Sequence, residues 1–283
     1  MGHGKLRKFA ENETFSCLLQ PSASEVLADG FFNLRDHEVK GHWNERMFDA
    51  PRPIVLELGC GKGEYTIDLA QRNPSCNYIG VDIKGARLWK GAKYATEHKL
   101  GNVAFLRTRI EFITAYFGPG EVSEIWLTFS DPQFRSENSR LTSPLFLERY
   151  RSFLKPGGIV HLKTDSMFLH QYSRSVAEAN GLRVLGCTED LYATPRETFG
   201  SLPPETVGAL YEVQTFYEKM FLQQGYKITY LSFIIDHDGP FAHPSGFDEE
   251  YWRSVEGPRL LFGHDSAETR RQKLHDPAAQ RDL

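Results

Sequence analysis

Short apolar runs alternate with amphipathic stretches through the middle of the chain. The runs have the length and composition of buried strands, and they cover residues 54–58, 77–82, 103–107, 124–129, 159–164, 182–186 and 228–235. The stretches between them have helical spacing: one ending near Arg72, then 86–99, 110–117, 146–154, 166–179 and 207–224. The 146–154 helix should stop at Pro156-Gly157-Gly158. This alternation predicts an α/β fold with a doubly wound sheet, mostly parallel.

The two ends of the chain lack this alternation of strand-like and helix-like patterns. Residues 1–50 show no clear periodicity and are interpreted as an N-terminal arm lying on the core. Residues 51–236 form the predicted domain. Residues 237–283 are rich in Asp, Gly, Pro and Arg, which favours a polar tail whose end is disordered.

Composition narrows the class of protein. The net charge is -4, so any nucleic-acid surface must gather its positive charge on one face. No stretch approaches the roughly 20 apolar residues that span a bilayer, and the N-terminus lacks the apolar segment of a signal peptide. The four cysteines form no CxxC pair, which argues against a disulfide framework or a zinc site. We therefore expect a cytoplasmic protein without a metal or a membrane contact.

A glycine-rich turn, VLELGCGKG, follows the first strand. Gly59, Gly61 and Gly63 permit tight backbone angles and a close approach to a ligand. The second strand ends in Asp82, close to the spacing at which an acid binds ribose hydroxyls in doubly wound folds. A plain structural turn is the alternative, and the paired acid makes it the weaker interpretation.

The glycine spacing also separates two cofactors. The third glycine comes one position earlier than in the dinucleotide pattern G-x-G-x-x-G, which disfavours an NAD oxidoreductase. Glu57, just before the turn, favours a cofactor that carries positive charge. S-adenosylmethionine, with its sulfonium and its amino group, fits that requirement.

Two further acids follow strands. Pro132 restricts Asp131 to extended backbone angles, so its carboxylate should project from the carboxyl end of the sheet, where ligands bind. The alternative is an Asx residue that starts a turn. Asp165 ends the fifth strand, and its alternative role is the N-cap of the helix that begins near Ser166.

The segments LELGCGKG, YIGVDIKGAR, TFSDPQFRSENSRL, LKTD (162–165) and TFYE (215–218) resemble the tRNA (guanine-N7-)-methyltransferase family. The resemblance covers roughly residues 50–235. It implies the seven-stranded, Rossmann-like methyltransferase fold with an antiparallel last strand. It also implies methyl transfer from S-adenosylmethionine to guanine N7 in the tRNA variable loop.

The resemblance assigns roles by position. The cofactor residues it implies are Glu57, Gly59, Gly61, Gly63, Asp82, Arg109 and Asp131, with Asp131 also at the reaction centre. Arg109 stands where the family has an acid that meets the adenine, with Glu111 nearby. The substrate residues it implies are Arg135, Asp165, Thr215, Phe216, Tyr217 and Glu218. Without the resemblance, Glu218 has the position of an ordinary surface carboxylate within a helix.

The fourth-strand segment departs from the family. Where the family has Phe-Pro-Asp-Pro-Trp, this chain has Phe129-Ser130-Asp131-Pro132-Gln133. The tryptophan after the second proline is therefore replaced by Gln133, although Phe134 is one step away. The family usually has a run of basic residues after this motif, and here only Arg135 and Arg140 remain. Together with Lys5, Arg7 and Lys8 of the arm, these arginines are candidates for a local positive face.

The sequence leaves three functions as alternatives. Guanine N7 carries a lone pair and no proton, so methyl transfer to it needs positioning rather than a general base. The chain is predicted to perform that reaction. A methyltransferase of the same class acting on another substrate fits the glycine turn and Asp82 equally well. A non-catalytic RNA-binding relative fits the altered segment 130–140, and the oligomeric state, monomer or homodimer, stays open.

Overall fold

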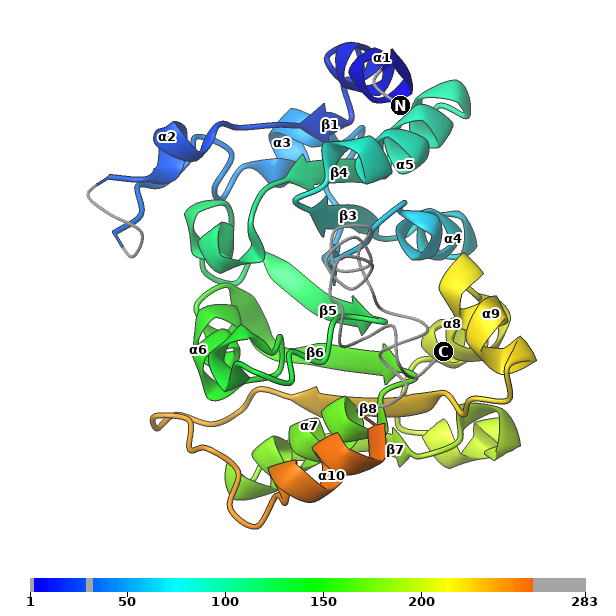
Figure 1. Cartoon of the computed structure of the whole chain (residues 1–283). Helices are drawn as coiled ribbons and strands as arrows, with labels where there is room; N and C mark the ends of the chain where they lie inside the picture. The colour runs from blue at the N-terminus through cyan, green and yellow to red at the C-terminus, as the bar shows by residue number, and fades with distance from the viewer. Residues whose placement is uncertain (1–2, 29–32, 257–283) are drawn as a thin grey trace, which may run out of the picture.

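An eight-stranded sheet forms the centre of the protein in the computed structural model, which describes residues 3–28 and 33–256 (Figure 1). The strand order is β1-β4-β3-β2-β5-β6-β8-β7. All pairs are parallel except those of β8, which runs antiparallel to both β6 and β7. The strands are β1 (Leu18–Leu19), β2 (Ile54–Leu58), β3 (Asn77–Asp82), β4 (Val103–Arg107), β5 (Val122–Thr128), β6 (Leu154–Thr164), β7 (Arg183–Thr188) and β8 (Thr229–Ile234).

The prediction of seven strands with an antiparallel last strand is confirmed, and the sheet has one short strand more. That strand, β1, comes from the arm and pairs with β4 at the sheet edge. The strand shows no signal in the sequence because two residues are too few for any periodicity.

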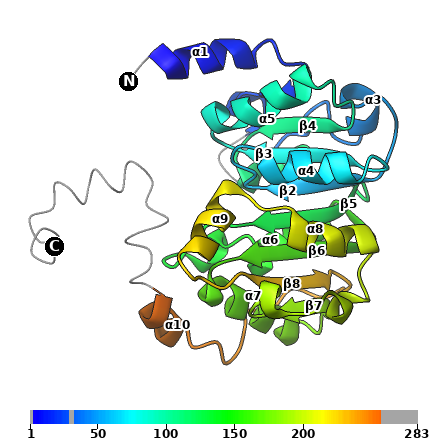
Figure 2. The same cartoon turned by 90° about the vertical axis from the view of Figure 1, so that its right-hand side faces the viewer.

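Helices cover both faces of the sheet, as a doubly wound fold requires (Figure 2). One hydrophobic cluster packs α4 (Glu64–Arg72), α5 (Gly85–Glu97), α8 (Pro204–Glu212) and α9 (Phe216–Gln223) against the sheet. The other cluster lies under α3 (Trp43–Met47), the 3-10 helix η1 (Ile110–Ala115), α6 (Pro144–Arg151) and α7 (Met167–Ala179). Strand β2 alternates between them: Leu56 joins the second cluster and Val55 the first.

Three predicted elements differ in type or extent. Residues 110–115 form a 3-10 helix rather than an α-helix. Strand β6 already begins at Leu154, so the Pro-Gly-Gly sequence lies within the strand. The single helix expected over 207–224 is two helices, because the Thr215 side chain accepts a hydrogen bond from Glu218 N at 3.1 Å and caps a new helix there.

Both ends of the chain contain helices that periodicity did not reveal. In the arm, α1 (His3–Asn12) packs on α5, where Trp89 Nε1 donates a hydrogen bond to Glu11 at 2.6 Å. A short helix, α2 (Ala23–Val26), follows. In the tail, α10 (Glu249–Glu256) runs beside α7. The disorder expected at the end of the tail concerns 257–283, outside the described residues. Within the described part of the chain, every helix is too short or too polar to cross a membrane.

Candidate active site

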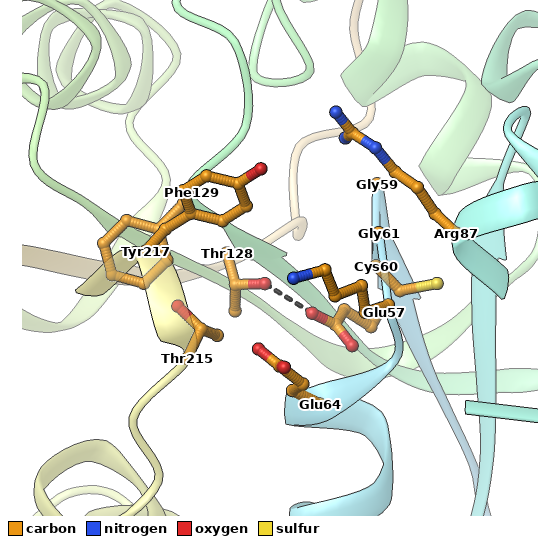
Figure 3. A pocket seen from close by; sticks show the side chains of 11 residues that line it. Glu57, Gly59, Cys60, Gly61, Glu64, Arg87, Thr128, Phe129, Thr215 and Tyr217 are labelled. Carbon is orange, nitrogen blue, oxygen red and sulfur yellow. Dashed lines mark hydrogen bonds between the residues drawn. The ribbon is translucent and has the colours of Figure 1, made fainter. Parts of the chain in front are cut away.

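A pocket opens at the carboxyl ends of β2 and β5 (Figure 3). It joins the glycine turn and α4 to the end of β5 and to the start of α9. The residues that line it are Glu57, Gly59, Cys60, Gly61, Lys62, Glu64, Arg87, Thr128, Phe129, Thr215 and Tyr217. Parts of three sequence motifs that are far apart along the chain therefore share one cavity.

The glycine turn has the left-handed backbone that its composition predicts. At Gly63, φ is 71°, and a Cβ would lie 2.6 Å from the ring of Phe105, so a side chain is excluded there. Gly61 N donates to one oxygen of Asp82 at 3.0 Å, and Lys84 N donates to the other at 2.7 Å. Burial raises the pKa of the Asp82 carboxyl, and the two backbone donors oppose that rise. Asp82 thus lies at the turn and braces it.

Glu57 is buried at the floor of the pocket between two threonines. Thr128 Oγ1 donates to one carboxylate oxygen at 2.5 Å. The other oxygen accepts from Thr66 N, at 2.8 Å in the first turn of α4, and from the Thr66 hydroxyl. Burial, with a smaller contribution from the negative charge of Asp82, raises the pKa of Glu57 to about 7. Sequence reasoning missed both threonines, since neither has a motif of its own.

Asp131 follows β5 on an exposed turn. Its Oδ1 accepts a hydrogen bond from Gln133 N at 2.9 Å, which is the Asx turn considered as the alternative role. Phe129 and Gln133, on either side, have φ of 51° and 49°, a backbone region that non-glycine residues occupy rarely. Asp131 is not part of the pocket lining, whereas Phe129 is. Arg135 lies exposed beyond this turn.

The start of α9 is tied directly to the glycine-turn helix. Phe216 N donates to Glu64 on α4 at 3.0 Å, and Lys62 Nζ lies 4.9 Å from the centre of the Phe216 ring. Thr215 and Tyr217 line the pocket, and Phe216 is 57% exposed at its rim. This segment therefore presents a hydroxyl and two accessible aromatic faces beside the pocket.

Glu218 does not face solvent, so the simple interpretation of a surface carboxylate is wrong. It is fully buried and pairs with the equally buried Lys163 of β6 at 2.7 Å. Lys163 also donates to Leu210 O at 2.8 Å, while Tyr192 OH donates to Glu218 at 2.7 Å. Burial lowers the pKa of Lys163, and Glu218 opposes that change. The pair fixes the α8–α9 segment to the sheet.

Two residues of the altered segment are also interior. Arg140 is fully buried, forms an ion pair with Glu249 at 3.0 Å, and lies over the Tyr172 ring at 4.4 Å. Phe134 is buried against Phe168, with ring centres 4.5 Å apart. The expectation that Arg140 contributes to an exposed positive face is therefore wrong, and the Phe134 ring lies in the interior. The partners come from the tail and α7, which the sequence did not connect with this segment.

Arg109 and Asp165 lie outside the pocket lining. Arg109 is exposed and pairs with Glu111 at 3.0 Å. Asp165 is half-buried between β6 and α7. The N-cap of α7 is Ser166, whose Oγ accepts from Leu169 N at 3.0 Å, so the capping role considered for Asp165 is wrong. Among residues 3–28 and 33–256, no three His, Cys, Asp or Glu side chains gather as a metal site would require.

The fold and the pocket agree with a methyltransferase, and comparison with known proteins gives that class directly. A family model described as "Putative methyltransferase" matches residues 51–226. A tRNA (guanine-N(7)-)-methyltransferase of Christiangramia forsetii is 49% identical over 82% of this chain and 97% of its own. One of Bacteroides thetaiotaomicron is 45% identical over 86% and 90%. A 16S rRNA methyltransferase structure has a TM-score of 0.45 at 18% identity, over 71% of this chain and 94% of its own.

The chain belongs to the tRNA (guanine-N(7)-)-methyltransferase family. The family resemblance that the sequence motifs indicated is therefore confirmed, as is the methyltransferase fold.

Proposed function

We propose that this protein transfers a methyl group from S-adenosylmethionine to guanine N7 in the tRNA variable loop, forming N7-methylguanosine. The observation that carries the proposal is the pocket itself. It brings Glu57 and the glycine turn together with Thr215 and Tyr217, which supports a cofactor side and a substrate side within one cavity. The names of the relatives support the same reaction.

The residues of the pocket fit a cationic nucleoside cofactor. Gly59 and Gly61 have open space where a Cβ would stand, so a ligand can approach their backbone. Each Asp82 oxygen has a lone pair left after its backbone bond, enough to accept a ribose hydroxyl. The carboxylates of Glu57 and Glu64 favour a cation. When bound, the cofactor supplies the activated methyl group. We propose that Asp131 and Arg109, which lie outside the pocket lining, contact the cofactor at the edge of the pocket.

The protein's own contribution to the reaction is positioning and charge. Guanine N7 already has its lone pair, so no side chain needs to remove a proton. Holding two reactants in line contributes on the order of 7–11 kcal/mol to catalysis. The exposed carboxylate of Asp131, fixed by its turn, would stabilise the positive charge that the methylated guanine acquires.

We propose that Asp165 binds the Watson–Crick edge of the guanine and that Glu218 holds the neighbouring segment in place. Guanine presents two donors on its Watson–Crick edge, and a carboxylate accepts both while N7 faces away. Glu218 is buried in its ion pair, so it holds Thr215 and Tyr217 in place instead of meeting the base. Phe216 and Tyr217 offer ring faces to the flipped base, and Arg135 offers a charge to the phosphates.

The tRNA, a polyanion, needs a positive surface on this acidic protein. Lys5, Arg7 and Lys8 on α1 are proposed to extend that surface. We further propose that residues 51–236 are the methyltransferase domain, with 1–50 as its arm and 237–283 as its tail. The four free cysteines fit a reducing cytoplasm.

Nucleoside mass mapping of methylated tRNA tests the proposal. The full chain, S-adenosylmethionine and an unmodified tRNA transcript should yield N7-methylguanosine in the variable loop. A transcript with 7-deazaguanine at that position is the matched control, because it lacks the nucleophilic nitrogen and should not react. A methyl group on another nucleoside would support a different substrate. Binding of tRNA without binding of the cofactor would support a non-catalytic RNA-binding protein.

A further inference from the structure

Helix α10 lies outside the matched family residues and runs along α7 (Figure 1). The segment that leads to it is bound to the core: Ala242 N donates to Asn180 at 2.7 Å, and the Phe247 ring packs edge-on against Tyr172 at 5.5 Å. Contacts of the preceding segment therefore hold the helix against the core, in addition to any contacts that its own side chains make.

Two residues of α10, one turn apart, hold the segment that follows β5. Arg253 donates a hydrogen bond to the backbone oxygen of Phe134 at 2.7 Å. Glu249, one turn earlier, pairs with both Arg253 and the buried Arg140. Residues 131–140 contain only a three-residue 3-10 helix, η2 (Glu137–Ser139), so tertiary contacts such as these determine where the segment lies.

The last residue of α10 holds the start of α7. Glu256, 6% exposed, accepts a hydrogen bond from Phe168 N at 2.7 Å. Phe168 N is one of the amides at the helix N-terminus, where a negative charge is favourable. Asp165 and Ser166 come immediately before this turn, so Glu256 helps to fix the direction in which the chain leaves β6.

We propose that α10 is a positioning element for the tRNA side of the active site. It holds in place the segment that carries Arg135 and the segment that carries Asp165. This inference rests on the proposed function, because only a substrate on that side would respond to their position. The cofactor side is braced separately, by Asp82 and Glu57 through their bonds to the glycine turn and α4. Loosening α10 should therefore change tRNA binding and leave cofactor binding alone.

Arg253→Met in the full chain is the test, because it removes the bond to Phe134 O and keeps the aliphatic stem. We expect the KM for tRNA to rise about tenfold, as for the loss of a hydrogen bond to a charged group. The S-adenosylmethionine Kd should stay within about twofold. Arg253→Lys, which can still donate to that oxygen, should restore most of the affinity.

Arg174→Met is the matched control. Arg174 pairs with Glu178 one turn along α7, and its side chain is 48% exposed against 49% for Arg253. It should behave as wild type, because its pair touches neither segment. Hydrogen exchange over residues 131–140 should speed up in Arg253→Met and not in Arg174→Met.

Each outcome has one meaning. If wild type methylates tRNA and Arg253→Met keeps its KM, the positioning role is overturned and the proposed function stands. If cofactor affinity falls along with the KM change, α10 acts on general stability and the inference is again overturned. If wild type yields no N7-methylguanosine in tRNA, the proposed function is wrong, and the role of α10 in tRNA binding, which rests on it, is wrong as well.

Discussion

The proposed cofactor side and the proposed substrate side of the pocket are built in different ways. On the cofactor side, Asp82 and Glu57 accept hydrogen bonds from backbone amides and hydroxyls of the glycine turn, of α4 and of the neighbouring strand β5. On the substrate side, segments are held by ion pairs between distant parts of the chain: Lys163 with Glu218, both buried, and the buried Arg140 with Glu249, whose side chain is 37% exposed. The first arrangement consists of hydrogen bonds, while the second depends on ion pairs with at least one buried partner.

This difference determines how each side tolerates change. A buried charge is costly unless its partner is present, so removal of one member of a pair leaves the other uncompensated. On the cofactor side, Gln in place of Glu57 can keep its bonds, because the Thr128 hydroxyl can accept as well as donate, while Asn in place of Asp82 loses one of its two backbone bonds. The substrate side should therefore be fragile toward single substitutions of its charges, and the cofactor side should respond mainly in ligand affinity.

The largest expected effect is the loss of Lys163. Lys163→Met leaves Glu218 buried without its cation, and we expect the free energy of unfolding to fall by roughly 3–5 kcal/mol. Urea denaturation followed by circular dichroism measures this. Lys227→Met, which breaks an exposed pair with Asp190, is the control and should cost about 1 kcal/mol or less. A loss from Lys163→Met no greater than the control would contradict the buried-pair description.

The next effect concerns chemistry rather than stability. Asp131→Asn keeps an oxygen that can accept from Gln133 N, so the turn and the fold should survive. It removes the negative charge, and we expect the single-turnover methylation rate to drop about a hundredfold. Asp36→Asn, at an exposed pair in the arm, should leave the rate unchanged. A wild-type rate in Asp131→Asn would end the electrostatic role proposed for that carboxylate.

Sequence alone predicted the sheet and the glycine turn because both depend on local patterns. The bounds of β2, β3 and β4 match their apolar runs, and the glycine turn has the backbone its residues require. The substrate side was less predictable, because a charge such as Arg140 or Glu218 looks the same in the sequence whether it is solvated or paired inside. Only the family resemblance singled out Glu218, and nothing in the sequence linked Arg140 to the tail.

A smaller effect tests whether Asp82 binds the ribose or only braces the turn. Asp82→Asn should weaken S-adenosylhomocysteine binding about tenfold, near 1.4 kcal/mol, in calorimetric titration. The matched ligand is the 2′-deoxy analogue, which lacks one hydroxyl. Wild type should prefer the ribose form, and Asp82→Asn should lose that preference. An equal preference in both proteins would leave Asp82 with the bracing role alone.

The smallest effect is a pH dependence on the cofactor side. With the pKa of Glu57 at about 7, the carboxyl is largely neutral below that pH and largely ionised above it. A cation binds the ionised form better, so S-adenosylmethionine affinity should increase about threefold between pH 6.5 and 7.5, following the ionised fraction. Isothermal titration at several pH values measures it. Glu57→Gln, which can still bond Thr66 and Thr128, should lack this increase.

The stability of the unliganded protein should change in the opposite direction. The pKa of Glu57 is raised on folding, so between about pH 4.5 and 7 the folded state binds more protons than the unfolded state. Wild-type stability, relative to Glu57→Gln, should therefore fall as pH rises through that window and level off above it, by roughly 3 kcal/mol at most. In the affinity measurement of the preceding prediction, the cofactor's own amino group titrates in the same way with wild type and with Glu57→Gln. Its contribution therefore cancels when the two affinity profiles are compared. Parallel pH profiles for the two proteins, in both affinity and stability, would mean that Glu57 is already ionised in the pocket.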